Sequence, residues 1–400
     1  MQPRVRVIQA GLGGYGHQYL GALLDRAADF GVELVAGVDP APERCDRLND
    51  LKARGVPVFT ALEEALDRVP AELAVISSPI HFHCPQSCLA AERGLDVLCE
   101  KPLAATPEEA RQMREAERKT GRFIAIGYDW SFADAIQRLK TDIRGGKFGR
   151  PLQFKTVVCW PRGEDYYGRN DWAGRQRAPD GRWVLDSPVN NATSHHLHNM
   201  LYLLGPNRET AAAPAEMTAE LYRAHAIDNF DTAALRLRTA DRVDLLFLTT
   251  HAVGWYLGPL IHYHFEEAEI IYDMRGGLPQ DAFTARFRDG RTVSYGSPGA
   301  GPLQKLRQAA TAVRTRAPVA CSVATATPHV QCVTSLHRTA QIHPFPKEIV
   351  EARGEAGQRL MEVRGLTEVF AQCYEQGCLP AELGGVDWAQ AGKKAAVSEP

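Results

Sequence analysis

The chain has 400 residues, enough for two domains that each bury a core of their own. Its hydrophobic fraction of 44% and charged fraction of 24% are those of an ordinary soluble globular protein. A formal net charge of −2 argues against nucleic acid or an anionic membrane as a partner, and no apolar run approaches the roughly 20 residues that cross a bilayer.

The first predicted element is an apolar strand, residues 4–10, that runs into a glycine-rich turn and a helix over residues 17–28. The turn has the spacing Gly-x-Gly-x-x-Gly, and its residues are Gly11, Leu12, Gly13, Gly14, Tyr15 and Gly16. Gly11 permits the tight bend, Gly13 lets a pyrophosphate approach the backbone, and Gly16 lets helix and strand pack closely. The phosphates would bind the N–H groups at the positive end of the helix dipole.

A second predicted strand, Val32–Val38, is followed by Asp39, which stands 23 residues after Gly16. This spacing is close to the roughly 20 residues expected for an acid that hydrogen-bonds a ribose hydroxyl. A carboxylate at this position would repel the 2′-phosphate of NADP, and the nearest arginine is Arg44. The turn and Asp39 together therefore predict a dinucleotide site that prefers NAD.

Short apolar strands alternate with amphipathic helices up to about residue 128, a pattern typical of a doubly wound parallel sheet covered on both faces. The later strands are predicted at residues 57–59, 73–77, 96–99 and 123–127, and the helices at 42–54, 61–67, 85–93 and 107–120. We therefore predict a Rossmann domain over residues 1–128.

Ligands bind beyond the carboxyl ends of such strands. The strand at 73–77 is followed by Ser78, Pro79 and, further on, His83, which we expect to contact the cofactor. A purely structural role for His83 is an equally open interpretation, and His81 is interpreted as structural or as a surface residue.

The strand at 96–99 ends in Glu100-Lys101-Pro102. An isolated Glu-Lys-Pro would be a surface turn before a helix. Because this one follows a buried strand on the cofactor side of the sheet, Glu100 and Lys101 are candidate site residues.

The pattern changes at about Trp130. A helix near 132–145 and a strand at 152–160 precede at least six alternating strands between residues 216 and 295, with turns such as Asp289-Gly290 between them. These strands include residues 232–237, 243–250, 261–266, 269–272 and 283–287, and the helices of this part lie near 193–204, 302–317, 327–342 and 366–375. We predict an α+β domain over residues 129–390, built on a large open, mostly antiparallel sheet that serves substrate binding and oligomerisation, and a flexible tail over residues 391–400.

A polar loop over residues 161–182 is rich in arginine and aromatic residues, and Arg162, Tyr167 and Trp172 are its candidate substrate contacts. Aromatic faces and guanidinium groups suit a polyhydroxylated or carboxylated ligand. A solvated connection or an oligomer contact explains the loop equally well.

The glycine turn, Asp39, Ser78-Pro79 with His83, and Glu100-Lys101-Pro102 follow one another in an order and spacing that resemble a known oxidoreductase family. That family is named after glucose-fructose oxidoreductase, inositol dehydrogenase and the rhizopine catabolism protein. The resemblance implies an NAD-binding Rossmann domain followed by an open antiparallel sheet, and it extends over nearly the whole chain.

A second motif of the family resembles Asp-x-Gly-x-His-x-x-Asp, which aligns here with Asn191 to His198. By this resemblance, His195 corresponds to the catalytic histidine. Asn191 and His198 stand where the family usually has aspartates, and Asp186-Ser187-Pro188 replaces a preceding triple glycine.

Oxidation of an alcohol needs a hydride acceptor and a base for the hydroxyl proton. We expect His195 to act as the general base or acid and Lys101 to orient the hydroxyl. Asn191 can only hydrogen-bond the substrate or the histidine, and His198, one turn on from His195, is a candidate substrate ligand or alternative base. A role in capping or packing the helix is an equally open interpretation for His196 and His198.

These residues predict an NAD-dependent dehydrogenase that acts on a CH–OH group of a sugar, a cyclitol or a derivative of one. Two alternatives come from the same resemblance: an enzyme that cleaves a glycosidic bond by transient oxidation, and a sensor that binds dinucleotide without catalysis. No metal ion is expected, because no acidic or cysteine partner stands at ligand spacing from the histidines on their helix.

Some apolar residues of the predicted sheet alternate toward its outer face, and burial against a second subunit would cover them. We therefore predict a homodimer or a homotetramer. The nine cysteines are odd in number and show no metal-type pairing, and the first strand begins too early for a signal peptide. We expect a cytoplasmic protein with reduced thiols.

Overall fold

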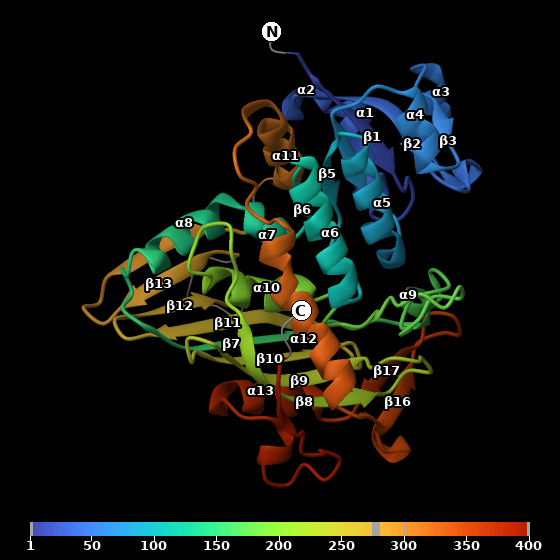
Figure 1. Cartoon of the computed structure of the whole chain (residues 1–400). Helices are drawn as coiled ribbons and strands as arrows, with labels where there is room; N and C mark the ends of the chain where they lie inside the picture. Colours follow the sequence, from blue (N-terminus) through green and yellow to red (C-terminus); the bar gives the residue numbers. More distant parts are fainter. Residues whose placement is uncertain (1–2, 274–280, 300, 302, 398–400) are drawn as a thin grey trace. The chain divides into compact units, whose positions relative to one another are not determined.

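The computed structural model describes residues 3–273, 281–299, 301 and 303–397 (Figure 1). The chain forms two compact units. Unit 1 comprises Met1–Phe132 and Gly301–Thr327, and unit 2 comprises Ala133–Ala300 and Pro328–Pro400. In the described ranges, no helix is both long enough and apolar enough to cross a membrane.

Unit 1 is built on a six-stranded parallel sheet in the order β3-β2-β1-β4-β5-β6. The strands are β1 Val5–Ala10, β2 Val32–Val38, β3 Val58–Phe59, β4 Leu73–Ile76, β5 Asp96–Cys99 and β6 Ile124–Ile126. Every residue of β4, β5 and β6 is buried, as expected for strands covered by helices on both faces. The strand order reverses between β1 and β4, which is where ligands of doubly wound sheets bind.

The helices of unit 1 are α1 Gly16–Asp25, α2 Ala27–Phe30, η1 Pro42–Arg44, α3 Leu48–Ala53, α4 Leu62–Arg68, α5 Ile80–Glu92, α6 Pro107–Thr120, α7 Asp129–Phe132 and α11 Gln304–Thr315. Local signals explain α6 well: Thr106 and Glu109 form a capping box, Pro107 opens the helix, and Gly121 ends it in the left-handed region. The predicted helix over residues 17–28 is divided in two, because Arg26 leaves the helical conformation.

The division of the chain differs from the predicted boundaries, because residues 301–327 belong to unit 1 and not to the second domain. Two contacts with the parallel sheet explain this. The N–H of Ile126 donates to the carbonyl of Cys321 at 2.8 Å, and Arg316 donates to Oδ2 of Asp96 at 2.7 Å. Sequence pattern alone gave no sign that the chain returns to the first sheet.

Unit 2 is built on a ten-stranded sheet in the order β14-β13-β12-β11-β7-β10-β9-β8-β15, with β18 also paired to β8. Its strands are β7 Pro151–Cys159, β8 Pro214–Arg223, β9 Thr232–Thr239, β10 Asp244–Thr250, β11 Leu257–Phe265, β12 Ala268–Tyr272, β13 Phe283–Phe287, β14 Thr292–Gly296, β15 Ile342–Pro344 and β18 Lys394–Ala396. The pairs β7–β10 and β8–β15 are parallel and the others antiparallel. The predicted large, mostly antiparallel sheet is confirmed.

The remaining elements are α8 Asp134–Arg144, α9 Glu164–Gly168, α10 Ser194–Leu203, α12 Val323–Thr339, α13 Leu366–Gln376, the short helices η2 Lys347–Ile349 and η3 Pro380–Glu382, and a hairpin of β16 Val350–Arg353 and β17 Leu360–Val363. One face of the sheet packs against α10, where Asn199 donates to the hydroxyl of Tyr263 at 3.4 Å. Tyr263 in turn stacks on Phe154 with ring centroids 3.9 Å apart.

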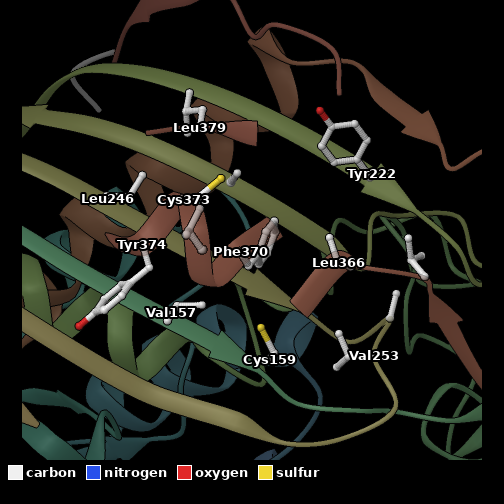
Figure 2. Packing of buried hydrophobic residues seen from close by; sticks show 14 of the residues in the cluster. Val157, Cys159, Tyr222, Leu246, Val253, Leu366, Phe370, Cys373, Tyr374 and Leu379 are labelled. Atoms are coloured by element: carbon white, nitrogen blue, oxygen red, sulfur yellow. The ribbon is translucent and has the colours of Figure 1, made fainter. Parts of the chain in front are cut away.

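The opposite face of the sheet is covered by α13 of the same chain. Figure 2 shows Leu366, Phe370 and Cys373 of α13 above the strands that carry Val157 and Leu246. All five side chains are buried, and burial of an aliphatic or aromatic side chain of this size stabilises the fold by roughly 1.5–3 kcal/mol. Part of the outer face that suggested a second subunit is thus covered within one chain. The homodimer or homotetramer stays a prediction.

The predicted flexible tail over residues 391–400 is wrong for its described part. Lys394–Ala396 pair with β8 as an antiparallel strand, and the N–H of Val397 donates to the carbonyl of Ala215 at 2.9 Å. An otherwise open sheet edge offers unpaired backbone groups, and this segment satisfies them. Residues 398–400 lie outside the described part of the chain.

Candidate functional site

The glycine turn of unit 1 lies between β1 and α1, and two of its glycines are packed against backbone. Gly11 has φ +84°, and its N–H donates to the carbonyl of Val38 at 2.8 Å. A Cβ atom on Gly11 would lie 2.7 Å from the carbonyl carbon of Ser77. A Cβ atom on Gly16 would overlap the carbonyl oxygen of Gly11 and lie 2.8 Å from Oγ of Ser77. Only glycine fits at these two positions.

The middle of the same turn is open. A Cβ atom on Gly13 or Gly14 would meet no atom within 4 Å. The N–H groups of Gly13, Gly14 and Tyr15 donate to no group in the part of the chain that the structure describes, and α1 begins directly afterwards at Gly16. A diphosphate needs this combination of unused N–H donors, space above the backbone and a helix N-terminus. These residues therefore fit the phosphates of a dinucleotide.

Asp39, directly after β2, connects the glycine turn to the strand end. Its Oδ2 accepts the N–H of Leu12 at 3.0 Å, and its Oδ1 accepts the N–H of Ala41 at 3.0 Å. Each carboxylate oxygen has a second lone pair, so the group can still accept a hydrogen bond from a ribose hydroxyl. Asp39 thus fits the ribose role and also holds the turn in shape, a role that the sequence did not reveal.

Substitution of glycines by alanine distinguishes an effect on packing in unit 1 from an effect on cofactor binding. Gly16→Ala is expected to destabilise unit 1 by several kcal/mol, because its methyl group collides with backbone. Gly13→Ala is expected to leave stability within about 1 kcal/mol of the parent and to weaken dinucleotide binding at least tenfold, because its methyl group enters the open space where phosphate would lie. Thermal unfolding and equilibrium titration with NAD measure the two effects.

Gly21→Ala is the matched control for this series. Gly21 lies within α1, and a Cβ atom there would also meet nothing within 4 Å. This variant should bind NAD like the parent and gain up to about 1 kcal/mol in stability, because alanine favours a helix interior over glycine. Equal NAD affinity in the Gly13→Ala and Gly21→Ala variants would contradict the phosphate-binding role of the turn.

His83 lies buried beneath the loop that follows β4 and contacts the backbone of this loop. The ring is 1% exposed, with Nδ1 2.7 Å from the carbonyl oxygen of Pro102 and Nε2 2.9 Å from that of Ser78. Burial lowers the pKa of His83. Both ring nitrogens face carbonyl oxygens of the protein, and the neutral ring donates to one of them. The contact of His83 with the cofactor stays a prediction. His83 joins the loops that follow β4 and β5. His81 is buried as well, in agreement with a structural role.

Ser78 and Pro79 lie where the sequence predicted, beyond the carboxyl end of β4. The hydroxyl of Ser78 donates to Oε1 of Gln86 at 2.6 Å, and Pro79 occupies the N-cap position of α5. Both residues remain partly exposed, so a contact with the cofactor stays a prediction.

Glu100, after β5, is engaged in a buried network. Its carboxylate forms an ion pair with Lys305 of α11 and accepts the hydroxyl of Tyr19 at 2.7 Å. Lys305 also lies 3.1 Å from Oδ1 of Asp129, and its side chain is fully buried. Burial opposes the charge of Lys305, but the two carboxylates outweigh this and raise its pKa above the ordinary value. Glu100 is thus a partner in a buried ion pair, and its contact with the cofactor stays a prediction.

Lys101 is half-buried beyond the carboxyl end of β5, and its N–H donates to Oε2 of Glu100 at 3.2 Å. The Glu100–Lys305 pair thus supports the backbone that presents Lys101. Tyr15 of the glycine turn joins the same network, because its hydroxyl accepts a hydrogen bond from Lys305 at 3.3 Å. Burial raises the pKa of Tyr15 to about 12. The sequence offered no signal for Lys305, which lies 204 positions after Lys101.

In unit 2, the histidine-rich segment forms the start of α10. His195 is half-buried in the first turn of the helix. His196 is buried against Trp160 with ring centroids 5.5 Å apart, and burial lowers its pKa to about 3. His198 is 1% exposed, and its ring stacks on Tyr202 of the same helix.

The structure gives His198 a buried position, and its role as a substrate ligand or alternative base stays a prediction. Burial, with the charges of His329 and Lys140, lowers its pKa well below the ordinary value, so the ring stays neutral inside unit 2. His196 is a packing residue for the same reason. Of the three histidines on this helix, His195 keeps the exposure that a substrate contact requires.

A carboxylate that the sequence did not single out lies beside Asn191. Asn191 donates from Nδ2 to Oδ1 of Asp186 at 2.6 Å, and the N–H of Gly174 donates to Oδ2 of Asp186 at 2.6 Å. Asp186 is 1% exposed. Because this bond uses the amide nitrogen of Asn191, the carbonyl Oδ1 of Asn191 is the atom that can accept a further hydrogen bond. The sequence contained one indication of this role, because Asp186-Ser187-Pro188 stands where the family often has three glycines.

The loop over residues 161–182 is ordered by contacts of its own side chains. The hydroxyl of Tyr167 lies 2.9 Å from Nδ1 of His251, and Arg162 donates to the hydroxyl of Tyr256 at 3.1 Å. Arg169 lies 3.7 Å from the ring centroid of Tyr166 and 5.4 Å from that of Trp172. These cation–π contacts argue against a merely solvated connection.

A pocket of about 780 Å³ lies within unit 2 beside this loop, and its lining includes Tyr167, Arg175, His225 and Arg359. Nδ1 of His225 is 2.8 Å from Oδ2 of the buried Asp231. Nε2 of His225 has no hydrogen-bond partner in the described ranges. Tyr167 is thus the predicted loop residue that reaches a pocket, and the His225–Asp231 pair is a polar element that the sequence reasoning missed.

Residues 5–128 match the model of an oxidoreductase family described as having an NAD-binding Rossmann fold. These residues therefore belong to this family. It is the one named after glucose-fructose oxidoreductase, inositol dehydrogenase and the rhizopine catabolism protein, so the predicted family and cofactor, NAD, are confirmed. The glycine turn, Asp39 and Lys101 all lie within the matched residues.

Curated relatives of this oxidoreductase family match parts of the chain. Inositol 2-dehydrogenase 4 of Saccharopolyspora erythraea is 33% identical over 225 residues, which are 54% of this chain and 60% of the relative. D-glucoside 3-dehydrogenase of Escherichia coli (strain K12) is 33% identical over 118 residues, which are 30% of this chain and 33% of the relative. The chain thus spans less than two thirds of the length of either relative.

A solved structure shows the same fold over most of the chain. The WlbA dehydrogenase of Chromobacterium violaceum, in complex with NADH and UDP-GlcNAcA, has a TM-score of 0.69 at 19% identity. The match covers 84% of this chain and 94% of that one. The predicted fold, a Rossmann unit with a second unit built on a large open sheet, is therefore confirmed.

Proposed function

We propose that the chain is an NAD-dependent dehydrogenase that transfers hydride between nicotinamide and a hydroxyl-bearing carbon of a sugar, a cyclitol or a derivative of one. The observation that carries this proposal is the open glycine turn next to Asp39, in which three N–H groups donate to no group among the described residues. The curated relatives named above act, by their names, on an inositol and on a glucoside, which supports a polyhydroxylated small molecule as the substrate.

When bound, NAD would supply the hydride acceptor at its nicotinamide ring. In this proposal, Lys101 orients the substrate hydroxyl and favours its partly ionised form. His195 takes the hydroxyl proton, and the carbonyl oxygen of Asn191 accepts a hydrogen bond from the substrate or from His195. Asp186 is a positioning residue in this scheme, since it holds the amide of Asn191 at 2.6 Å.

The loop residues Arg162, Tyr167 and Trp172 stay proposed substrate contacts. Tyr167 is favoured among them, because it lines the pocket of about 780 Å³ in unit 2. Planar guanidinium and aromatic groups suit hydroxyl and carboxylate groups of a sugar derivative.

The test is a turnover assay on the purified full chain with NAD or NADP and a panel of sugars, cyclitols and sugar acids. The proposal expects NADH to accumulate in step with oxidised product, and NAD to be used in preference to NADP, since Asp39 would repel a 2′-phosphate. Product without NADH, with cofactor retained on the protein, would indicate cleavage of a glycosidic bond. Tight NAD binding without turnover of any substrate would indicate a sensor, and either outcome would overturn the proposal.

A further inference from the structure

Two histidines and a glutamate lie together on the sheet of unit 2, and none of them takes part in the proposed reaction. His262 and His264 are two positions apart on β11, so strand alternation puts both on the same face of the sheet. Glu269 of β12 lies directly opposite His264 in the antiparallel register. Leu260, two positions before His262, belongs to the core beneath α13, so the three residues share the face that α13 partly covers.

The donor atoms of these three side chains converge. Nε2 of His262 lies 3.2 Å from Oε2 of Glu269, and Nδ1 of His264 lies 3.6 Å from Oε1 of the same carboxylate. One donor atom from each residue lies within 4.8 Å of the other two. The two imidazole rings are close neighbours, with centroids 3.8 Å apart.

The spacing suits a metal ion better than a hydrogen-bonded pair. Although Nε2 of His262 is buried and close to the carboxylate, it makes no hydrogen bond of acceptable geometry within the described residues. Ligand atoms bound at about 2.0–2.1 Å around a tetrahedral ion stand roughly 3.4 Å apart. The distances from the two imidazole nitrogens to the carboxylate, 3.2 Å to Oε2 and 3.6 Å to Oε1, are close to that value.

We propose that His262, His264 and Glu269 bind one divalent transition-metal ion. Two imidazole nitrogens and a carboxylate favour zinc, cobalt or nickel over magnesium and calcium, which prefer oxygen ligands. The side chains are 24%, 29% and 49% exposed, so a fourth coordination position is open to water or to a small ligand. The nearby Lys155 is directed to α13, where its Nζ donates to the carbonyl of Glu375 at 3.4 Å.

The test is a titration of the chelator-treated full chain with cobalt and, separately, with zinc. We expect one ion per chain, with the visible bands of cobalt bound by nitrogen and oxygen and no sulfur-to-cobalt charge-transfer band. His262→Gln, His264→Gln and Glu269→Gln should each weaken binding at least about tenfold, since even changes outside the first ligand layer cost that much. Because these side chains are partly exposed, the three variants should fold like the parent, and circular dichroism checks this.

Two matched controls separate this site from adventitious binding. Glu267→Gln makes the same charge change in the turn between β11 and β12, and His343→Gln removes a histidine from β15 of the same sheet. Both should bind cobalt like the parent. The proposal is overturned if the parent binds no ion in this titration, or if the three site variants bind as tightly as the controls. Neither result would bear on the dehydrogenase, since none of these residues takes part in the proposed reaction.

Discussion

The Lys101→Ala variant is expected to lose turnover by about 10²–10³-fold while it still binds NAD, because a preorganised charge at the reacting hydroxyl contributes that much to catalysis. Lys101 extends from the end of β5, one residue after Glu100, whose carboxylate holds the backbone in place. Removal of the side chain should therefore change the chemistry more than the fold. Steady-state kinetics measure the loss, and equilibrium titration measures NAD affinity.

Control variants test whether the loss of turnover is specific to Lys101. Lys119→Ala removes an exposed lysine from α6 of the same unit and should leave turnover unchanged. His195→Gln should lose about 10²–10⁴-fold, the usual contribution of a general base. If both groups act in one step, the Lys101→Ala/His195→Gln double variant should lose less than the product of the single losses. Turnover by Lys101→Ala at the level of the parent would remove Lys101 from the mechanism.

The Lys305→Met variant is expected to destabilise unit 1 by about 3–5 kcal/mol, the usual cost of leaving a buried charge without its partner. Lys305 is fully buried, is paired with Glu100 and lies 3.1 Å from Asp129. Methionine keeps most of the apolar part of the side chain and removes the ammonium group with its hydrogen bonds. Hydrogen exchange of peptides from β1 to β6 reports the stability of unit 1 without interference from unit 2.

The double variant Glu100→Gln/Lys305→Met shows whether the loss of stability comes from an unpaired buried carboxylate or from altered packing. With both charges removed, the destabilisation should be clearly smaller than in Lys305→Met alone. Lys119→Met, at an exposed lysine, should change stability by no more than about 0.5 kcal/mol. A Lys305→Met variant as stable as Lys119→Met would show that the ion pair does not hold the β5 end in place.

Local sequence signals predicted much of the fold. The strands Val32–Val38, Asp96–Cys99 and Phe283–Phe287 and the helix Pro107–Thr120 have the bounds that the sequence predicted. Each depends on residues within one strand or a few helical turns, such as the capping box at the start of α6. The glycine turn was readable for the same reason, because six consecutive residues carry its geometry.

Partners far apart in the sequence were not predictable in this way. In the sequence, nothing distinguishes Glu100 and Lys305 from charged surface residues, although they form a buried ion pair. The sequence also does not show that the ring nitrogens of His83 face two carbonyl oxygens of the protein. The role of Asp186 depends on the fold of the loop that brings Gly174 and Asn191 to its two oxygens. Sequence spacing does not reveal which buried polar groups satisfy one another.

The sequence by itself determined the dinucleotide turn, its ribose-binding acid and the alternation that makes a parallel sheet, because each is a property of neighbouring residues. Only the tertiary structure decided that residues 301–327 return to the first unit, that α13 covers part of the outer face of the second sheet, and that His196 and His198 are buried. These outcomes depend on which apolar and charged groups the path of the whole chain brings together. Burial then decides whether an ionisable side chain pairs within the protein or remains available to a ligand.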